Sequence, residues 1–265
     1  FYTAYCAERP ALGYSNHNWT LPEPTAASYT QELIDNAKSF SDTAMVVISR
    51  VGGEFADLPT DMSTVNYTDN STEYKDFEDG QHYLSLSKTE RDMIDLVCSN
   101  FDNVVLVYNA ANTLELGFVD EHPQIKSVIW CPGTGQTGFN ALGEIVAGEV
   151  NPSGHSADTF VYDLTAAPYF NNIGAFAYTN ADSVDAALVP PHFVNYVEGI
   201  YVGYKFYETA AAEGLIDYDK TVQYPFGHGL SYTTFTQKID SMTEADGTIT
   251  LDVTVTNTGS VAGKD

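Results

Sequence analysis

The sequence has little positive charge. Eleven Lys and Arg stand against 36 Asp and Glu in 265 residues, which gives a formal net charge of −25. A protein of this charge repels the phosphates of nucleic acid and of anionic membrane surfaces, so neither is expected as a partner. Long apolar runs are also missing: none approaches the roughly 20 residues needed to cross a bilayer, and no signal peptide is visible. A neutral partner fits this composition best.

Cysteine and metal-binding patterns are scarce. Cys6, Cys98 and Cys131 have no C-x-x-C spacing and no histidine nearby in a zinc-like pattern. Buried thiols are the simplest interpretation, and one disulfide with one remaining thiol is the alternative. The six histidines are scattered without H-x-x-x-H, and no G-x-S-x-G elbow is present. We therefore expect no metal and no cofactor.

The ends of the sequence suggest a piece of a longer protein. The chain starts on Phe1 without an initiator Met and stops inside an apparent strand pattern. Asn18, Asn66 and Asn70 begin N-x-T sequons, which matter only in a glycosylating secretory pathway. The sequons do not set the compartment, although a secreted or cell-surface location is favoured over a cytoplasmic one.

What the sequence does contain is hydrophobic periodicity, with 43% hydrophobic and 13% aromatic residues. Short apolar runs alternate with helical patterns, which is typical of a layered α/β sandwich with a mostly parallel sheet. The run at 44–48 predicts a strand buried on both faces, and Ser87-Lys-Thr-Glu90 is a capping box that predicts a helix start. Strands are expected at 44–48, 104–108, 127–131 and 159–162, and helices at 28–40, from 87 toward 101, and over about 138–148.

The last part of the chain has a different hydrophobic pattern. In "TITLDVTVTNTG" apolar residues alternate with Thr and Asp, which predicts the beginning of an all-β sandwich. We expect an α/β domain over residues 1–234 and a truncated β-sandwich over 235–265. The segment "GIYVGYKFYETAAAEG" fits either a strand or a helical face.

One generic motif favours a nucleotide. Gly133-Thr-Gly135-Gln-Thr-Gly138 is a G-x-G-x-x-G that follows an expected strand and opens an expected helix, and Asp158 or Asp163 lies further along. The fingerprint normally begins a nucleotide-binding unit, whereas here it follows the third strand. The alternative is a tight strand-to-helix turn packed against a neighbour.

Glu54 is the candidate catalytic residue by position. It follows the strand at 44–48 by a few residues, and ligands of open α/β sheets bind outside the carboxyl ends of the strands. Gly52 and Gly53 permit a sharp turn there, and a general acid needs such a placement in a cleft. The alternative is a solvated loop charge, since 36 carboxylates place some acids after strands by chance.

Four ordered motifs resemble glycoside hydrolase family 3, the family of β-glucosidases and related exo-acting enzymes. "VVISRVGGEFAD" resembles its V-x-x-S-R-x-x-G-E-G-x-D loop, and "WCPGTGQTGFNALGEIVAGEVNPSGH" is similar to its W-x-x-G-Q-x-G signature ending in N-P-S-G. "VEGIYVGYKFYE" and "YPFGHGLSYTTF" resemble two further motifs, the second leading into a fibronectin type III-like domain. The resemblance runs from about residue 44 to the end and gives the Gly-rich turn a packing role.

The resemblance implies a site. It carries the role of general acid/base onto Glu54 and gives Asp57 and Arg50 supporting, substrate-binding places. The nucleophile of the family is an Asp in a separate (β/α)8 barrel, and nothing in this chain looks like that barrel. A retaining mechanism needs both carboxyl groups, so the chain alone is expected to be inactive. The expected partners are that barrel and a β-linked glucoside or oligosaccharide.

Two departures from the family pattern are visible. Phe55 replaces the glycine usual after the glutamate, and no motif like N-D-G-x-L-P-L precedes the first strand. The alternative function from another class is a noncatalytic carbohydrate-binding or structural module on the same scaffold. Dinucleotide binding is the third functional hypothesis.

Overall fold

The computed structural model describes residues 2–7, 22–52, 58–64, 75–172, 176–180 and 192–264. The chain forms two compact units, one made of Phe1–Gly133 with Thr159–Tyr224 and the other of Thr134–Asp158 with Pro225–Asp265. The predicted division into 1–234 and 235–265 stays a prediction.

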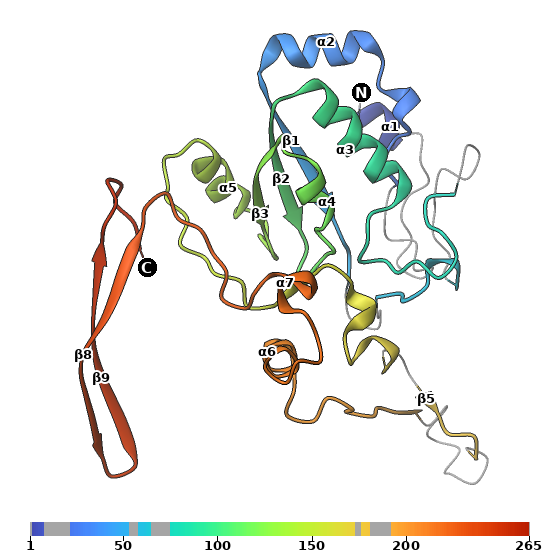
Figure 1. The fold of residues 1–265 in the computed structure, drawn as a ribbon. Coiled ribbons are helices and arrows are strands. Elements are labelled where there is room, and N and C mark those ends of the chain that lie inside the picture. Colours follow the sequence, from blue (N-terminus) through green and yellow to red (C-terminus); the bar gives the residue numbers. More distant parts are fainter. Residues whose placement is uncertain are drawn as a thin grey trace. The chain divides into compact units, whose positions relative to one another are not determined.

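The first unit is built on a parallel sheet. Strands β1, β2 and β3 pair in that order and run parallel (Figure 1). The predicted α/β architecture is confirmed, and the strands expected at 44–48, 104–108, 127–131 and 159–162 are all present. The unit contains α1 (Tyr2–Ala7), α2 (Gln31–Phe40), β1 (Thr43–Ser49), α3 (Lys88–Asn100), β2 (Asn103–Asn109), α4 (Phe118–Glu121), β3 (Ile125–Trp130), β4 (Phe160–Val161), β5 (Phe176–Ala177), β6 (His192–Phe193), α6 (Tyr204–Ala212), α7 (Tyr218–Thr221) and β7 (Val222–Tyr224).

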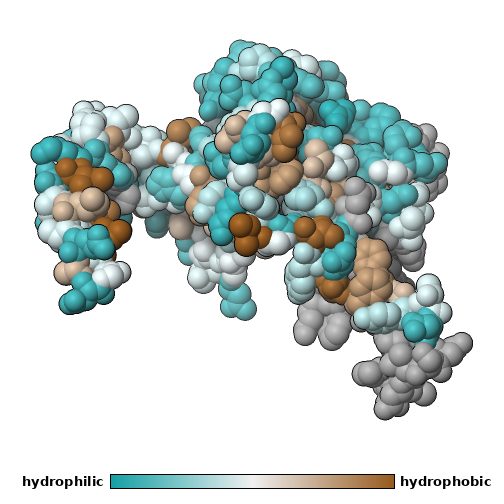
Figure 2. Space-filling model, turned by 60° about the horizontal axis from the view of Figure 1, so that its bottom comes forward, coloured by the Kyte–Doolittle hydropathy of each residue, from teal (hydrophilic) through white to brown (hydrophobic). Residues whose placement is uncertain are grey.

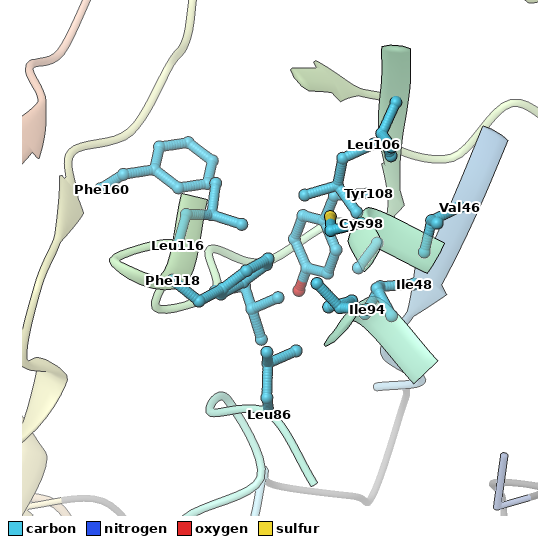
Figure 3. Close-up of a cluster of buried hydrophobic side chains, with 13 residues drawn as sticks. Val46, Ile48, Leu86, Ile94, Cys98, Leu106, Tyr108, Leu116, Phe118 and Phe160 are labelled. Atoms are coloured by element: carbon cyan, nitrogen blue, oxygen red, sulfur yellow. The ribbon is translucent and has the colours of Figure 1, made fainter. Parts of the chain in front are cut away.

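The core of this unit lies between the sheet and α3. Figure 3 shows Ile94 and Cys98 of α3 among side chains of β1 and β2. Leu106 and Tyr108 of β2 are 0% exposed. At about 25 cal/mol per Å² of apolar surface removed from water, such burial is the main favourable term holding α3 to the sheet.

Strand β1 is buried on one face only. Val46 and Ile48 are 5% and 1% exposed, whereas Met45 and Val47, which point to the other face, are 48% and 47% exposed. The prediction of a strand buried on both faces is wrong for the described residues. The reason is that side chains alternate between faces and α3 contributes core residues to only one of them.

Helix α2 is more exposed than its apolar pattern suggested, and the segment with an ambiguous pattern contains a helix. Helix α2 has an apolar stripe, but none of its residues is buried and Phe40 is 92% exposed. Within the ambiguous segment at 199–214, residues 204–212 form helix α6, which begins after Gly203 at a φ of 60° and buries Tyr207 and Ala210. These two residues are three apart, so they lie on one helical face.

The second unit contains α5 (Phe139–Val146) and an antiparallel hairpin of β8 (Phe235–Ala245) and β9 (Thr248–Asn257). Asp246 and Gly247 both have positive φ, as a two-residue type I′ hairpin turn requires. Apolar side chains of the hairpin lie at the surface (Figure 2), with Ile239 62% exposed. The alternation therefore predicted the strands correctly, and the β-sandwich they would begin stays a prediction.

Asn151 of the N-P-S-G stretch joins three segments of the second unit. Its Oδ1 accepts hydrogen bonds from the hydroxyl of Ser231 at 2.9 Å and from the amide of Tyr232 at 2.8 Å. Its Nδ2 donates to the carbonyl of Ala262 at 3.0 Å. Two of the motifs noted in the sequence, N-P-S-G and H-G-L-S-Y, therefore meet through one amide side chain.

No helix among the described residues is long and apolar enough to span a membrane.

We predict that Leu106→Ala lowers the free energy of unfolding by about 2–5 kcal/mol, because it leaves a cavity in a close-packed core. Urea unfolding of the chain measures the change. Phe40→Ala is the control, since this side chain is 92% exposed, and its effect should stay below about 0.5 kcal/mol. Equal losses for the two variants would contradict the assignment of the core.

Candidate functional site

The candidate site lies at the carboxyl end of β1. Residues 50–52 leave the strand and residues 58–59 return, and we call these segments the first and second stems of the loop. Glu54 and Asp57, the predicted acid/base and its neighbour, lie between the stems and outside the described residues. The structure therefore describes what holds this loop rather than the loop itself.

Arg50 of the first stem is buried, with 6% of its surface exposed, and its guanidinium makes a bidentate ion pair with Glu90 of α3. Nη1 lies 2.5 Å from Oε1 and Nη2 lies 2.6 Å from Oε2. The other donors bond to backbone carbonyls: Nε to Tyr83 at 2.6 Å, Nη1 to Ser49 at 2.9 Å and Nη2 to Ser85 at 2.8 Å. These five hydrogen bonds use all five N–H groups of a guanidinium.

This arrangement bears on the predicted role of Arg50. Since every donor is used inside the domain, the geometry favours a part in holding the first stem over direct contact with a sugar. Burial acts to lower the pKa of Arg50, and the charge and hydrogen bonds of Glu90 outweigh it, so the pKa lies above its usual range. The guanidinium stays charged in this pair.

Glu90 also takes part in the N-terminal cap of α3. Its carboxylate accepts the backbone N–H of Ser87 at 2.9 Å, and the Ser87 hydroxyl accepts the N–H of Glu90 at 3.2 Å. The predicted capping box is confirmed. No local pattern indicates that the same carboxylate also binds Arg50, which is 40 residues away. The start of α3 and the end of β1 are therefore joined through one side chain.

Two further carboxyl groups lie beside this pair. Asp76 is 1% exposed and accepts the N–H of Thr89, in the first turn of α3, at 3.2 Å. Burial raises the pKa of Glu23 to about 7, and the charges of Glu90 and Asp76 add to the rise while Arg50 opposes it. Glu23 therefore interacts with both members of the ion pair and with Asp76. Neither Glu23 nor Asp76 belongs to a motif noted in the sequence.

The Gly-rich turn at 133–138 is explained by its backbone. Gly133 and Gly135 have φ of 53° and 61°, in the left-handed region. A Cβ on Gly138 would lie 2.3 Å from the carbonyl oxygen of Thr134, which accepts the amide of Gly138 at 3.0 Å. These positions need glycine for the turn itself, which agrees with the tight turn of the alternative interpretation. The packing against a neighbour is not seen among the described residues, since a Cβ on Gly133 or Gly135 would meet no atom within 4 Å.

Two of the three cysteines lie among the residues whose side chains are described. Cys98 is buried, Cys131 is partly buried, and both are free thiols. Burial raises the pKa of each thiol, with the charge of Asp95 adding to the effect at Cys98. Neither has the lowered pKa of a reactive cysteine.

We predict that Glu90→Gln lowers the free energy of unfolding by about 3–5 kcal/mol, because it leaves the guanidinium of Arg50 buried without its counter-charge. Asp92→Asn is the matched control on the same helix. Its carboxylate pairs with Lys88 at 2.7 Å at the surface, so the loss should stay below about 1 kcal/mol. Urea unfolding distinguishes the two. Similar losses would mean that the buried pair contributes no more than a surface pair.

A second prediction concerns pH. The pKa of Glu23 is about 7 in the folded chain and 4.5 ordinarily, so between these values the folded state holds a proton that the unfolded state releases. The stability from this group is complete below pH 4.5 and is lost as the pH rises to about 7, by up to about 3 kcal/mol. Glu23→Gln, which cannot ionise, should gain stability relative to the natural chain across this window.

The measurement is urea unfolding of both chains between pH 4 and pH 8. Glu32→Gln at an exposed position of α2 is the control for replacing a glutamate by glutamine. A constant difference between Glu23→Gln and the natural chain at all pH values would refute the shifted titration of Glu23.

Comparison with known proteins identifies the family. The family model for the glycosyl hydrolase family 3 C-terminal domain matches residues 14–204. β-Glucosidase A of Butyrivibrio fibrisolvens is 30% identical over 100% of this chain and 31% of that protein. Thermostable β-glucosidase B of Acetivibrio thermocellus is 32% identical over 89% of this chain and 26% of that protein.

Solved structures agree. A β-glucosidase from Paenibacillus barengoltzii superposes with a TM-score of 0.72 at 28% identity, over 97% of this chain and 24% of that one. β-Glucosidase 3B from Thermotoga neapolitana, in complex with glycerol, superposes with a TM-score of 0.67 at 25% identity, over 99% of this chain and 32% of that one. The chain spans less than a third of the length of these relatives. It belongs to glycosyl hydrolase family 3 and carries the C-terminal domain of that family.

Proposed function

We propose that this chain supplies the general acid/base, Glu54, and one wall of the sugar site to a retaining, exo-acting β-glucosidase. The nucleophile would be an Asp of a (β/α)8 barrel in the full-length protein. The carrying observation is that the loop with the family's S-R-x-x-G-E pattern leaves the carboxyl end of β1 on a stem held by a buried ion pair. The names of the relatives supply the substrate class, a β-linked glucoside.

The chemistry would follow the double displacement. The barrel Asp attacks the anomeric carbon while Glu54 gives its proton to the departing glycosidic oxygen, so the C–O bond breaks as a glycosyl–Asp ester forms. Glu54, now ionised, takes a proton from water, which attacks the same carbon and releases the Asp. The two carboxyl groups must lie about 5–5.5 Å apart for this mechanism.

The residues near Glu54 would have unequal parts. Arg50, whose donors are all used within the domain, would hold the first stem. Asp57, two residues beyond Phe55 in the sequence, would support the loop, and it is the nearest competitor for the acid role. A secreted or cell-surface location would suit an enzyme that acts on external oligosaccharides, and the three sequons are compatible with it.

The test is Glu54→Gln in the full-length protein, with two substrates. Hydrolysis of an alkyl β-glucoside, whose leaving group must be protonated, should slow by roughly 10²–10⁴-fold, the usual contribution of a general acid. The dinitrophenolate of a dinitrophenyl β-glucoside leaves without being protonated, so the formation of the glycosyl–Asp ester from this substrate should slow far less. Steady-state rates with both substrates and the size of the phenol burst measure the difference.

Asp57→Asn is the matched control, since it changes a carboxylate three residues away in the same loop. We expect it to slow both substrates alike. Equal slowing of both substrates by Glu54→Gln, or the selective pattern in Asp57→Asn instead, would contradict the assignment. Binding of glucoside without any turnover by the full-length protein would favour the noncatalytic alternative. The 265-residue chain alone should show no turnover.

A further inference from the structure

Both stems of the loop that contains Glu54 bond to the same residue, Tyr83. We propose that Tyr83 is a positioning residue that fixes the two stems relative to each other and so keeps the acid/base in place. This inference rests on the proposed function of Glu54. It assigns a role to a residue in the long polar segment before α3, where neither the sequence patterns nor the family motifs pointed.

The first stem meets Tyr83 at two points. The amide of Val51 donates to the Tyr83 hydroxyl at 3.1 Å, and Nε of Arg50 donates to the Tyr83 carbonyl at 2.6 Å. The guanidinium also lies over the Tyr83 ring, with Cζ 5.0 Å from the ring centroid. A buried cation over an aromatic face adds an attraction that a solvated one would largely lose.

The second stem meets Tyr83 through the backbone. The Tyr83 amide donates to the carbonyl of Pro59 at 3.0 Å, and Leu58 packs against the small cluster that Tyr83 forms with Met62 and Phe77. Three residues after Pro59, the amide of Met62 donates to the carbonyl of Gln81 at 2.8 Å. The returning chain is therefore paired with residues 81–83.

The stems also approach each other directly. A Cβ on Gly52 would lie 3.2 Å from Cδ2 of Leu58, which is tighter than ordinary van der Waals contact. The five residues 53–57 are thus joined to two fixed and adjacent ends. A short loop closed in this way has far fewer conformations than a free one, and small displacements of a catalytic group are costly to rate.

Tyr83 can act in this way because its own segment is held. On one side of it, Nε2 of His82 lies 3.0 Å from Oε1 of Glu115, and Nδ1 accepts the amide of Leu84 at 3.1 Å. On the other side, the carbonyl of Leu84 accepts the amide of Glu115 at 3.0 Å. Tyr83 itself is 5% exposed. The residue that joins the stems is therefore part of the packed domain and not of the loop.

The hydroxyl of Tyr83 offers a narrow test. Tyr83→Phe keeps the ring, the contact with Arg50 and both backbone hydrogen bonds, and removes the hydroxyl that accepts the amide of Val51. Tyr108→Phe is the matched control: its ring is 0% exposed, its hydroxyl donates to the carbonyl of Thr113 at 3.3 Å, and it has no hydrogen bond to the described stems. Both variants lose one hydroxyl from a buried tyrosine, Tyr108 in the core against α3 and Tyr83 in the small cluster with Met62 and Phe77.

The experiment uses the full-length protein and two readouts. In Tyr83→Phe, we expect hydrolysis of an alkyl β-glucoside to slow by roughly 3–10-fold in kcat, because protonation of its leaving group needs a well-placed acid. The first step of the dinitrophenyl β-glucoside, the burst that releases dinitrophenolate, should slow less than about twofold, because this step needs no acid. Amide hydrogen exchange of the peptide that spans residues 50–59 should become faster. Tyr108→Phe should change neither the ratio of the two rates nor this exchange, whatever its effect on thermal stability.

Unchanged exchange in Tyr83→Phe would overturn the proposal, because the stems would then be held without the hydroxyl. Faster exchange with both substrates slowed alike would overturn it as well, since the loop would be loosened without an effect on acid catalysis. Glu54→Gln, measured in parallel, separates the two ideas. If it keeps its selective effect on the alkyl glucoside, only the role of Tyr83 fails, and if it loses that effect, the acid role of Glu54 fails too.

Discussion

The ion pair between Arg50 and Glu90 is the interaction on which the candidate site depends. Removing two charges from water is costly, and the attraction between them compensates only when the geometry is good and every remaining donor finds an acceptor. Here both conditions hold, because the pair is bidentate and backbone carbonyls take the other N–H groups. The pair is therefore specific to one arrangement of its neighbours.

Hydrophobic packing alone would not define that arrangement. Ile94 and Cys98 bury well against β1 and β2, but apolar burial is non-directional and tolerates sliding of a helix along a sheet. The ion pair joins the first turn of α3 to the end of β1. This is the edge of a parallel sheet at which ligands bind. The constraint thus acts where a family 3 domain needs a defined loop.

The same region shows how a strongly acidic chain uses its charge. Glu90 pairs with the guanidinium of Arg50, Glu23 interacts with both of them and with Asp76, and the amide of Thr89 at the start of α3 adds a partial positive charge near Asp76. Burial favours the neutral form of Glu23, so the cluster need not hold three negative charges at once. Its charge balance depends on residues from three separated segments and cannot be deduced from net charge.

Local patterns in the sequence predicted the local structure. The capping box at Ser87, the strand at 104–108 and the glycines of the 133–138 turn each depend on neighbours only a few residues away, and all were read correctly. Family motifs then located the loop with Glu54. The same motifs contain Arg50, whose substrate-binding place stays a prediction, because a motif states which residues recur and not what they touch.

Tertiary structure decided what lies between distant segments. It left one face of β1 exposed, made a helix of the ambiguous residues 204–212, gave Glu90 a second partner and brought Tyr83 to both stems of one loop. The physical reason is that a hydrogen bond or an ion pair across 30 or 40 residues leaves no periodic trace in the chain. Sequence determined which short elements form, and only the folded packing determined which side chains hold the site together.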